Sequence, residues 1–411
     1  DRAKGTEREN TMSSEGVLAG LQVVEVSAFV AAPFAGMVLA QLGAEVIRVD
    51  PVGGGIDHDR WPVTRDGKSL YWAGLNKGKR SMAVDVRTDE GRDLVRRLVT
   101  APGENRGILV TNLTPRWLDY ESLREQRPDL IMVALSGNPD GSAAVDYTVN
   151  AAAGYPDVTG GDSPVNHVLP AWDLLAGSMV ATAVLAAERR RRSTGRGELV
   201  TLSLADVAFT SVGHLGHVAE VVVNDVDRDR YGNYLYGAFG KDFDSSDGSR
   251  VMVVALSPRQ WSALVGATGS GPELAEVAAS GGWDFSSDGD RFRAREEIAA
   301  VLAPWFASRR LDDIAQALDE AGVLWGPYRT FRGLVEVDQR VDPDVNPIWQ
   351  MLDQPGIGRY PAPGSPLRFS DAENLSPRPS PELGTDTAAI LQEVLGLGDA
   401  EIERLRDKKA W

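Results

Sequence analysis

The sequence predicts an α/β protein that combines a large doubly wound domain with a smaller α+β domain. Short buried strands alternate with helices from Leu18 onward, which is typical of βαβ units and of a parallel sheet. Between residues 225 and 330 the strands and helices take a different spacing. The chain also has 411 residues, which is longer than most single domains.

A βαβ unit opens the pattern. Residues 21–26 (LQVVEV) predict a short buried strand, and residues 33–42 predict a helix with Pro33 in its first turn and Gly43 at its end. Residues 45–49 (EVIRV) predict the second strand. A helix that joins two parallel strands in this way is the repeating unit of a Rossmann-like sheet.

The alternation continues, and then the middle of the chain changes character. Further strands are predicted at 81–86, 107–111, 130–135 and 199–204, and further helices at 89–98, 173–192 and 205–223. Residues 224–248 predict a long loop rich in Gly, Asp and aromatic residues. After it come a strand at 250–256 and amphipathic helices at 291–307 and 311–321. Beyond the Pro-rich stretch 361–381, the tail 385–411 is predicted to return to helix.

These changes divide the chain into four predicted segments. Residues 1–16 are predicted to be a leader outside the fold, because the start of the chain is polar and lacks a pattern. Residues 17–224 form the first part of the large domain, and residues 225–330 form the small domain. Residues 331–411 are predicted to return and complete the large domain.

Charge and cysteine content exclude several classes of function. The net charge of −16 argues against the basic surface on which non-specific nucleic-acid binding depends. The absence of cysteine excludes disulfides, Cys-ligated zinc, iron–sulfur clusters and thiol catalysis. The four histidines are scattered, so no metal site is predicted, and no stretch approaches the roughly 20 apolar residues that span a bilayer. We therefore expect a cytoplasmic enzyme with no membrane partner.

Two segments are candidates for binding phosphate. The loop 27–33 lies between a strand and a helix, where doubly wound sheets bind nucleotides. It has neither a GxGxxG nor a Walker pattern, so an ordinary strand–helix turn is the alternative. The basic cluster 76–81 precedes a strand and could hold phosphates at a sheet edge. A solvated run of charges beside the strand is the alternative there.

Asp173 is the candidate nucleophile. It begins a long helix that is otherwise nearly free of charge until Glu188. The helix dipole favours an ionised carboxylate at this end, and such a carboxylate can attack an acyl group. An N-cap is the common alternative role for Asp at a helix start. At two other places a structural role is favoured over ligand binding. The arginines at 189–192 are predicted to complement the helix dipole, and His214 and His217 are predicted to pack against the core or an interface.

Several motifs together resemble the class III CoA-transferases, the family that includes formyl-CoA transferase, carnitine CoA-transferase and α-methylacyl-CoA racemase. They lie at 20–26, 32–33, 42–50, 75–81, 195–197 and 364–367, and the resemblance covers nearly the whole chain from Leu18. In this family the catalytic Asp begins the helix that precedes an R-x-x-x-G-x-G break. That position is Asp173 here, so the resemblance favours the nucleophile over the cap.

The resemblance also implies binding residues. The positions that look like CoA contacts, with coenzyme A as part of the substrate rather than a prosthetic group, are Val30, Ala31, Arg48, Val84, Arg87, Asn112, Leu113, Arg116 and Asp146. Chemistry and the resemblance together suggest contacts to the acyl group from His167, Arg60, Tyr236, Gly237 and Gly240. The family fold is an interlocked, ring-shaped homodimer, which we expect here too.

Departures from the family pattern narrow the reaction. The racemase branch needs a His where this chain has Val145, which argues against racemisation. The consecutive glycines of the formyl-CoA branch are replaced by residues 232–243, which suggests another acyl group. The stretches 27–33, 53–55, 60–64, 165–173, 232–243 and 354–358 are similar to a subgroup that moves CoA between the two carboxyl groups of one C5 dicarboxylate, mesaconate.

The implied reaction is therefore an intramolecular CoA transfer through an aspartyl intermediate. Residues 232–243 would act as a lid that retains the dicarboxylate. Two alternatives stay open at this point. One is intermolecular transfer of CoA to a separate organic acid, and the other is a non-catalytic protein that binds CoA esters.

Overall fold

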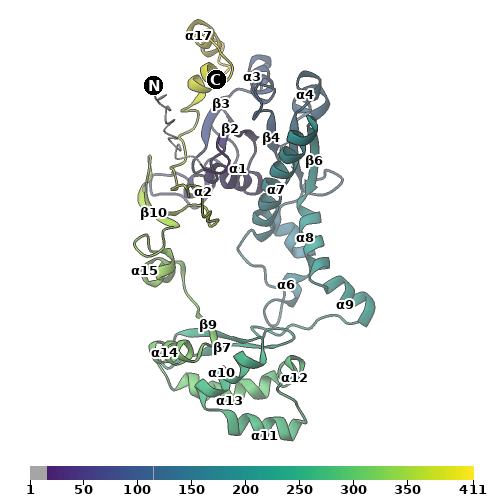
Figure 1. Cartoon of the computed structure of the whole chain (residues 1–411), viewed down its shortest axis with the longest axis vertical. Coiled ribbons are helices and arrows are strands. Elements are labelled where there is room, and N and C mark those ends of the chain that lie inside the picture. The colour runs from purple at the N-terminus through teal and green to yellow at the C-terminus, as the bar shows by residue number, and fades with distance from the viewer. Residues whose placement is uncertain (1–15, 114) are drawn as a thin grey trace, which may run out of the picture. The chain divides into compact units, whose positions relative to one another are not determined.

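The computed structural model describes residues 16–113 and 115–411, so most of the predicted leader lies outside the described residues. The chain divides into two compact units. Within the described residues, the first unit contains 16–153, Val168–Val218 and Gln339–Trp411. The second contains Gly154–His167 and Ala219–Asp338 (Figure 1). The short segment Gly154–His167 thus belongs with the second unit, a grouping that the sequence pattern does not predict.

A six-stranded parallel sheet forms the centre of the first unit. Its order is β3-β2-β1-β4-β5-β6, with every neighbouring pair parallel. This confirms the predicted α/β class, and the strand order is that of a doubly wound sheet. The strands are β1 (Gln22–Val26), β2 (Glu45–Pro51), β3 (Arg80–Val84), β4 (Ile108–Thr111), β5 (Ile131–Ser136) and β6 (Glu198–Ser203).

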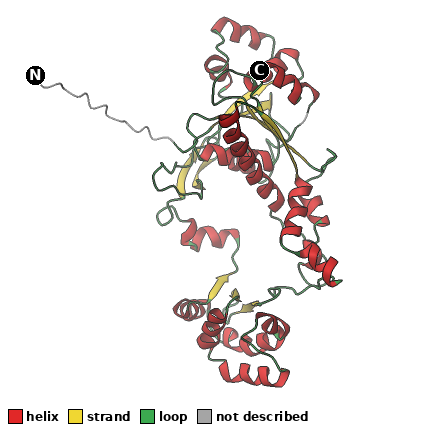
Figure 2. Cartoon of the chain, turned by 45° about the vertical axis from the view of Figure 1, so that its right-hand side comes forward, coloured by secondary structure: helices red, strands yellow, loops and turns green. Residues whose placement is uncertain are grey.

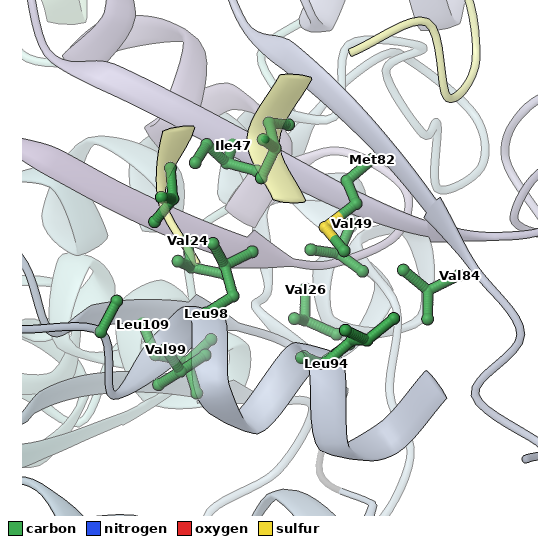
Figure 3. Packing of buried hydrophobic residues seen from close by; sticks show 14 of the residues in the cluster. Val24, Val26, Ile47, Val49, Met82, Val84, Leu94, Leu98, Val99 and Leu109 are labelled. Atoms are coloured by element: carbon green, nitrogen blue, oxygen red, sulfur yellow. The ribbon is translucent and has the colours of Figure 1, made fainter. Parts of the chain in front are cut away.

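One face of this sheet buries an aliphatic cluster. Alternate residues of β1 and β2, such as Val24 and Ile47, pack against Leu94 and Leu98 of helix α3 (Asp89–Val99), as Figure 3 shows. The C-terminal helices α16 (Thr387–Glu393) and α17 (Asp399–Asp407) supply further members of the same cluster. The β-branched and leucine side chains of the sheet's strands are typical of strands that are covered on both faces.

The opposite face of the sheet is unusual because it buries charge. Since side chains alternate along a strand, Glu25 and Arg48 point away from the aliphatic cluster. Both are at most 1% exposed. Helix α1 (Ala31–Gln41) covers this face and packs closely against helix α7 (Ala171–Thr194). Figure 2 shows helices flanking the strands of this unit.

Gly36 of α1 provides a test of this packing. A Cβ at this position would overlap the Glu25 carboxylate and come within 3.3 Å of Lys79 Cε, so it would disturb a buried ion pair. Alanine normally stabilises a helix relative to glycine by about 1 kcal/mol. Here we expect Gly36→Ala to lower the free energy of unfolding by ~2–4 kcal/mol.

Urea unfolding of the two variants Gly36→Ala and Gly213→Ala measures the effect. Gly213 lies in helix α8 (Leu204–His214), and a Cβ there would meet no atom within 4 Å. The control should unfold at or above the wild-type midpoint. Equal midpoints for both variants would show that the close approach of α1 to the buried pair is wrong.

The C-terminal segment completes the edge of the sheet at β3. The Asp386 carboxylate accepts a hydrogen bond from Ser81 N (2.8 Å), and Thr387 Oγ1 accepts one from Ala83 N (3.0 Å). The remaining elements of this unit are α2 (Leu70–Leu75), η1 (Arg116–Leu118), α4 (Tyr120–Gln126), α5 (Asp146–Ala152), η2 (Gln339–Val341) and the antiparallel pair β10 (Trp349–Gln354) and β11 (Gly358–Pro363).

The second unit is an antiparallel sheet covered by helices. Its strands are β7 (Phe239–Asp244), β8 (Arg250–Ala255) and β9 (Leu324–Pro327), in the order β7-β8-β9. Their apolar side chains and those of the helices form a separate core. The helices are α6 (Tyr155–Val158), α10 (Pro258–Thr268), α11 (Gly271–Gly281), α12 (Asp288–Arg293), α13 (Arg295–Ala307), α14 (Leu311–Ala321) and α15 (Phe331–Val337). Helix α9 (His217–Asn224) begins in the first unit and continues in the second.

Three predicted elements are wrong in detail. The helix expected at 205–223 is two helices, α8 and α9, because the chain turns at Gly216, whose φ is +83°. The helix expected at 291–307 is likewise interrupted at Ala294. The loop expected at 224–248 contains strand β7, whose Phe239 and Phe243 are buried in the core.

Helix α7 also differs from expectation. By length and composition alone it could cross a membrane, and it is the one described helix that could. Its apolar character has a packing explanation, since it contacts α1, α8, β5 and β6. One described shorter apolar helix is its neighbour α1.

Candidate active site

The order of the sheet reverses between β1 and β4, and the loops that follow these strands are joined. The Asn112 side chain accepts a hydrogen bond from Ala28 N (2.9 Å) and donates one to Ala28 O (2.7 Å). Ligands of doubly wound sheets bind at such a switch point. The structure thus brings together the predicted CoA-contacting positions Val30, Ala31, Asn112 and Leu113.

The first turn of α1 presents free backbone donors at this point. Val30 is the N-cap of α1 and provides no side-chain hydrogen bond to the helix. The N–H groups of a first turn have no intrahelical acceptor, and they point along the axis toward solvent or a ligand. Pro33 contributes no N–H, so the donors available here come from Val30, Ala31 and Ala32. Such donors can stabilise an oxyanion.

Asp173 lies in the first turn of α7 but does not cap it. The N-cap is Pro170, and the Asp146 carboxylate of α5 takes over the capping by accepting hydrogen bonds from Trp172 N (2.8 Å) and Asp173 N (3.0 Å). Trp172 is 8% exposed and donates to Asn150 Oδ1 (3.0 Å), which anchors this turn. Among the described residues, none donates a hydrogen bond to the Asp173 carboxylate. The cap alternative for Asp173 is therefore wrong.

The surroundings of Asp173 make its carboxylate a strong base. Burial and, secondly, the negative charge of Asp146 raise its pKa to about 7, and the positive charge of Arg60 opposes both. A carboxylate with a raised pKa is more nucleophilic when ionised, because it is less well solvated and more basic.

This pKa predicts the pH dependence of any reaction in which Asp173 is the nucleophile. Only the ionised form attacks, so kcat/KM should rise with pH through about 7 and then reach a plateau. Asp146→Asn keeps an oxygen to cap α7 but removes one negative charge, so it should move this limb to lower pH. Steady-state rates between pH 5 and 9 check both. A limb that is absent in the wild type, or that is unmoved in the variant, would contradict the assignment.

Arg60 is the cation that faces Asp173. Its guanidinium lies 4.9 Å from the Tyr71 ring centroid and 5.5 Å from that of Phe29. It forms no ion pair with a described residue, so it is available to an anionic ligand. The pKa of Tyr71 is raised by burial, lowered by Arg60, and raised by Asp173 and Tyr147. The side chains of Arg60, Tyr71, Tyr147 and Asp173 thus belong to one site.

Close helix packing places this site beside the free donors of α1. A Cβ on Gly177 of α7 would lie 2.5 Å from Ala31 O and 2.9 Å from the Phe34 ring. Gly177 follows Asp173 by one helical turn on the same face, and Ala31 is the first residue of α1. Asp173 therefore lies one helical turn from the point where α7 contacts the first residue of α1. A nucleophile, an anchoring cation and oxyanion donors are the components of an acyl-transfer site.

Comparison with known proteins agrees with this geometry. A protein-family model described as CoA-transferase family III matches residues 18–387. The chain belongs to this family.

Three relatives show how far the similarity extends. The 2-methylfumaryl-CoA isomerase of Chloroflexus aurantiacus is 54% identical over 399 residues, which cover 96% of this chain and 97% of that protein. A succinyl-CoA:mesaconate CoA-transferase of Haloarcula hispanica is 27% identical and covers 94% of this chain and 99% of that protein. The crystal structure of a CAIB/BAIF family protein from Brucella suis matches 92% of this chain and all of that chain, with a TM-score of 0.75 and 27% identity.

Arg48 is predicted from the sequence to contact a phosphate of CoA. The structure favours a structural role for it instead. Its guanidinium donates to Asp50, Asp57, Asn76 Oδ1 and Ser27 O, and it is 1% exposed. The basic cluster that precedes β3 is buried as well. Lys79 pairs with Glu25 at 2.8 Å, and burial lowers the pKa of Lys79 to about 8. Lys79 is therefore not part of a solvated run of charges, which was the alternative interpretation.

Asp146 also has a role other than the predicted contact with CoA. It is 1% exposed, and one of its oxygens accepts both hydrogen bonds from the start of α7. It positions Asp173 and raises its pKa. Val84 is wholly buried in the aliphatic cluster, so any contact it makes with CoA would come from its backbone.

Two arginines remain on the surface as predicted candidates. Arg87 is exposed and forms a bidentate salt bridge with Asp85, in which both hydrogen bonds are 2.8 Å long. Arg116 is exposed at the start of η1 and has no ion pair with a described residue. Arg116 is therefore the more available cation for a phosphate, and its role stays a prediction.

The remaining acyl-group candidates belong to the second unit. The Tyr236 hydroxyl donates to Glu220 (2.6 Å), and the Arg228 guanidinium lies 3.6 Å from the centroid of its ring. Gly240 is buried in β7, where a Cβ would come within 2.8 Å of Leu235 Cβ, which gives this glycine a packing reason. Gly237 has a φ of +77° and His167 is half-buried. Contacts of these residues with a substrate stay predictions.

Sequence reasoning missed several members of the site. Tyr71, Tyr147 and Asp57 have no pattern of spacing that would connect them with Asp173. Two signals point to their neighbours: residues 60–64, which include Arg60, resemble the subgroup, and the loop 27–33 contains Phe29. No group of three or more His, Cys, Asp or Glu side chains that could hold a metal occurs among residues 16–113 and 115–411.

Proposed function

We propose that this enzyme transfers CoA between the C1 and C4 carboxyl groups of mesaconate, which is a 2-methylfumaryl-CoA isomerase activity. The observation that carries the proposal is the 54% identity with the Chloroflexus enzyme over nearly the full length of both chains. The geometry is consistent with it, because the Asp173 carboxylate lies close enough to Arg60 for their charges to interact, and Arg60 has no ion pair with a described residue.

The first half of the reaction releases the dicarboxylate. The Asp173 carboxylate attacks the thioester carbonyl of mesaconyl-C1-CoA, and the C–S bond breaks to give a mixed anhydride and CoA thiolate. The thiolate then attacks the aspartyl carbonyl of the anhydride. This yields an aspartyl-CoA thioester and mesaconate with both carboxylates free.

The second half repeats these steps at the other end of the acid. The C4 carboxylate attacks the aspartyl thioester, which forms a new mixed anhydride and releases CoA thiolate again. The thiolate attacks the C4 carbonyl, so mesaconyl-C4-CoA leaves and the Asp173 carboxylate is restored. No electron is gained or lost over the cycle, so the steps require no redox cofactor.

The site supplies the groups that these steps need. Each attack places negative charge on a carbonyl oxygen, which the free N–H groups at the start of α1 can stabilise. Arg60 is suited to hold the carboxylate that is not reacting, because a guanidinium binds a carboxylate through two parallel hydrogen bonds. Between the two halves mesaconate turns without leaving the site, so that Arg60 holds the C4 carboxylate first and the C1 carboxylate second.

Incubation with mesaconyl-C1-CoA, followed by liquid chromatography and mass spectrometry, tests the proposal. We expect the C4 isomer to appear without added acid and without net consumption of thioester. Failure to turn over this thioester, with turnover of succinyl-CoA plus an acceptor acid, would favour the intermolecular alternative. Binding of CoA esters with no turnover would favour the non-catalytic alternative.

We further propose that the protein acts as a cytoplasmic homodimer, with the interlocked ring of its family. Helix α9 has no buried residue, and its Val222 and Val223 are 77% and 78% exposed. Phe331 of α15, another helix with no buried residue, is 85% exposed. Apolar surface of this kind usually meets a partner. A stable monomer in light scattering at micromolar concentration would overturn the dimer.

A further inference from the structure

Asp57 connects the buried charges beneath α1 with the backbone of residues 27–33, the active-site loop between β1 and α1. Its carboxylate is 2% exposed and accepts hydrogen bonds from Arg48 Nη2, both at 3.1 Å. The same carboxylate accepts a hydrogen bond from Phe29 N at 3.0 Å. Arg48 is in turn fixed by Asp50, with bonds of 2.9 Å and 3.1 Å. Asp57 is therefore held from one side and holds Phe29 on the other.

Phe29 needs such a restraint. Its φ is +67°, in the left-handed region that costs an ordinary residue about 1–2 kcal/mol. The residue is also 36% exposed, so packing does little to fix it. Two hydrogen bonds restrain the peptide unit between Ala28 and Phe29: Phe29 N donates to Asp57, and Ala28 O accepts from the Asn112 side chain. The bond to Asp57 is the one that fixes the N–H of Phe29 itself.

Two catalytic groups depend on this turn. Phe29 directly precedes Val30 and Ala31, so its conformation sets the direction of their N–H groups at the start of α1. Its ring also lies under the guanidinium of Arg60. A relaxed turn would therefore misdirect the oxyanion donors and loosen the anchoring cation together.

We infer that Asp57 is a positioning residue for CoA transfer, which acts by holding the Phe29 turn in its left-handed conformation. The inference rests on the proposed function and adds to it a residue that touches neither the acyl group nor Asp173. Because misplaced donors weaken the transition state more than the bound substrate, loss of Asp57 should lower kcat and leave KM largely unchanged.

Asp50 offers a matched control. It binds the same guanidinium, is also 2% exposed and makes no hydrogen bond to the active-site loop. If the acidic residues around Arg48 only stabilise the fold, Asp50→Ala and Asp57→Ala should affect activity alike. If Asp57 positions the turn, only its variants should lose kcat.

The experiment measures kcat and KM with mesaconyl-C1-CoA, together with amide hydrogen exchange of a peptide containing residues 27–31. For Asp57→Ala we expect kcat to fall about 30-fold or more, with KM within about threefold of wild type and faster exchange of this peptide. Asp57→Asn, which keeps an acceptor for Phe29 N, should fall less. The Asp50 control should keep kcat within about threefold and unfold at lower urea.

Three outcomes are distinguishable. Equal losses of kcat in the Asp50 and Asp57 variants, or unchanged kcat and exchange in Asp57→Ala, would overturn the inference. A wild-type enzyme that turns over no thioester would refute the proposed function instead. In that case the exchange of residues 27–31 still decides whether Asp57 holds the turn, because that measurement needs no substrate.

Discussion

Replacing Asp173 by alanine or asparagine is expected to abolish CoA transfer, with a loss of at least about 10⁴-fold in kcat. The reason is that no other carboxylate can take its place. The neighbouring Asp146 is buried and already accepts two hydrogen bonds from the start of α7. Binding of free CoA should change little, since Asp173 is not among the predicted CoA contacts, four of which lie on the loops after β1 and β4.

The same variants should be more stable than the wild type. Burial raises the pKa of Asp173 to about 7, so the folded protein binds this proton more tightly than the unfolded chain does. The contribution of this group to stability therefore falls as pH rises from about 4 to 7. At pH 8, Asp173→Asn should raise the free energy of unfolding by about 1 kcal/mol.

Glu188→Gln is the matched control for Asp173. It removes a carboxylate from the same helix, 15 residues and about 22 Å further along. Glu188 is paired with Arg192, and its loss should leave kcat within about twofold. Residual turnover of Asp173→Ala near the wild-type rate, or an equal loss in both variants, would remove Asp173 as the nucleophile.

Replacing Arg60 has the second largest expected effect. Arg60→Ala should lower kcat/KM for mesaconyl-C1-CoA by about 10²-fold, because a charged, two-fold hydrogen bond to the free carboxylate is worth ~2–4 kcal/mol. The released dicarboxylate should also escape more often, so free mesaconate should accumulate. Arg60→Lys should retain part of the activity, since it keeps the charge but loses the planar fork.

Arg65→Ala is the control for this prediction. Arg65 is an exposed arginine five residues further along the same loop and has no ion pair with a described residue. Chromatography of the reaction mixture measures thioester and free acid together. If Arg60→Ala and Arg65→Ala behave alike, the second carboxylate is held elsewhere, and His167 or Tyr236 becomes the next residue to replace.

The fold could be predicted where one local pattern decides the structure. All six strands of the parallel sheet were expected within two residues, because each is a short apolar run between helices. Helix 311–321 was expected with its observed bounds, since Gly322 ends it with a φ of +70°. Breaks such as that at Ala294 depend on tertiary packing, and no residue that disfavours helix marks them.

The residues of the candidate site, like the elements of the fold, could be predicted only where a local pattern marks them. Asp173 could be predicted because a helix start and a family motif coincide there. The buried state of Arg48 could not, because it depends on Asp50, Asp57 and Asn76 folding around it. From the sequence, an arginine near a phosphate-type loop has the same appearance whether its partner is a ligand or a neighbouring carboxylate.

One measurement tests most directly the claim that CoA moves within a single dicarboxylate through Asp173. Mesaconyl-C1-CoA is incubated with the enzyme in the presence of excess ¹³C-labelled free mesaconate, and the product thioester is analysed by mass spectrometry. We predict that the C4 isomer forms without label, and that brief quenching with hydroxylamine traps a modified Asp173. Label in the product at the level of the free acid would contradict intramolecular transfer, and isomerisation with no adduct at Asp173 would contradict the covalent route.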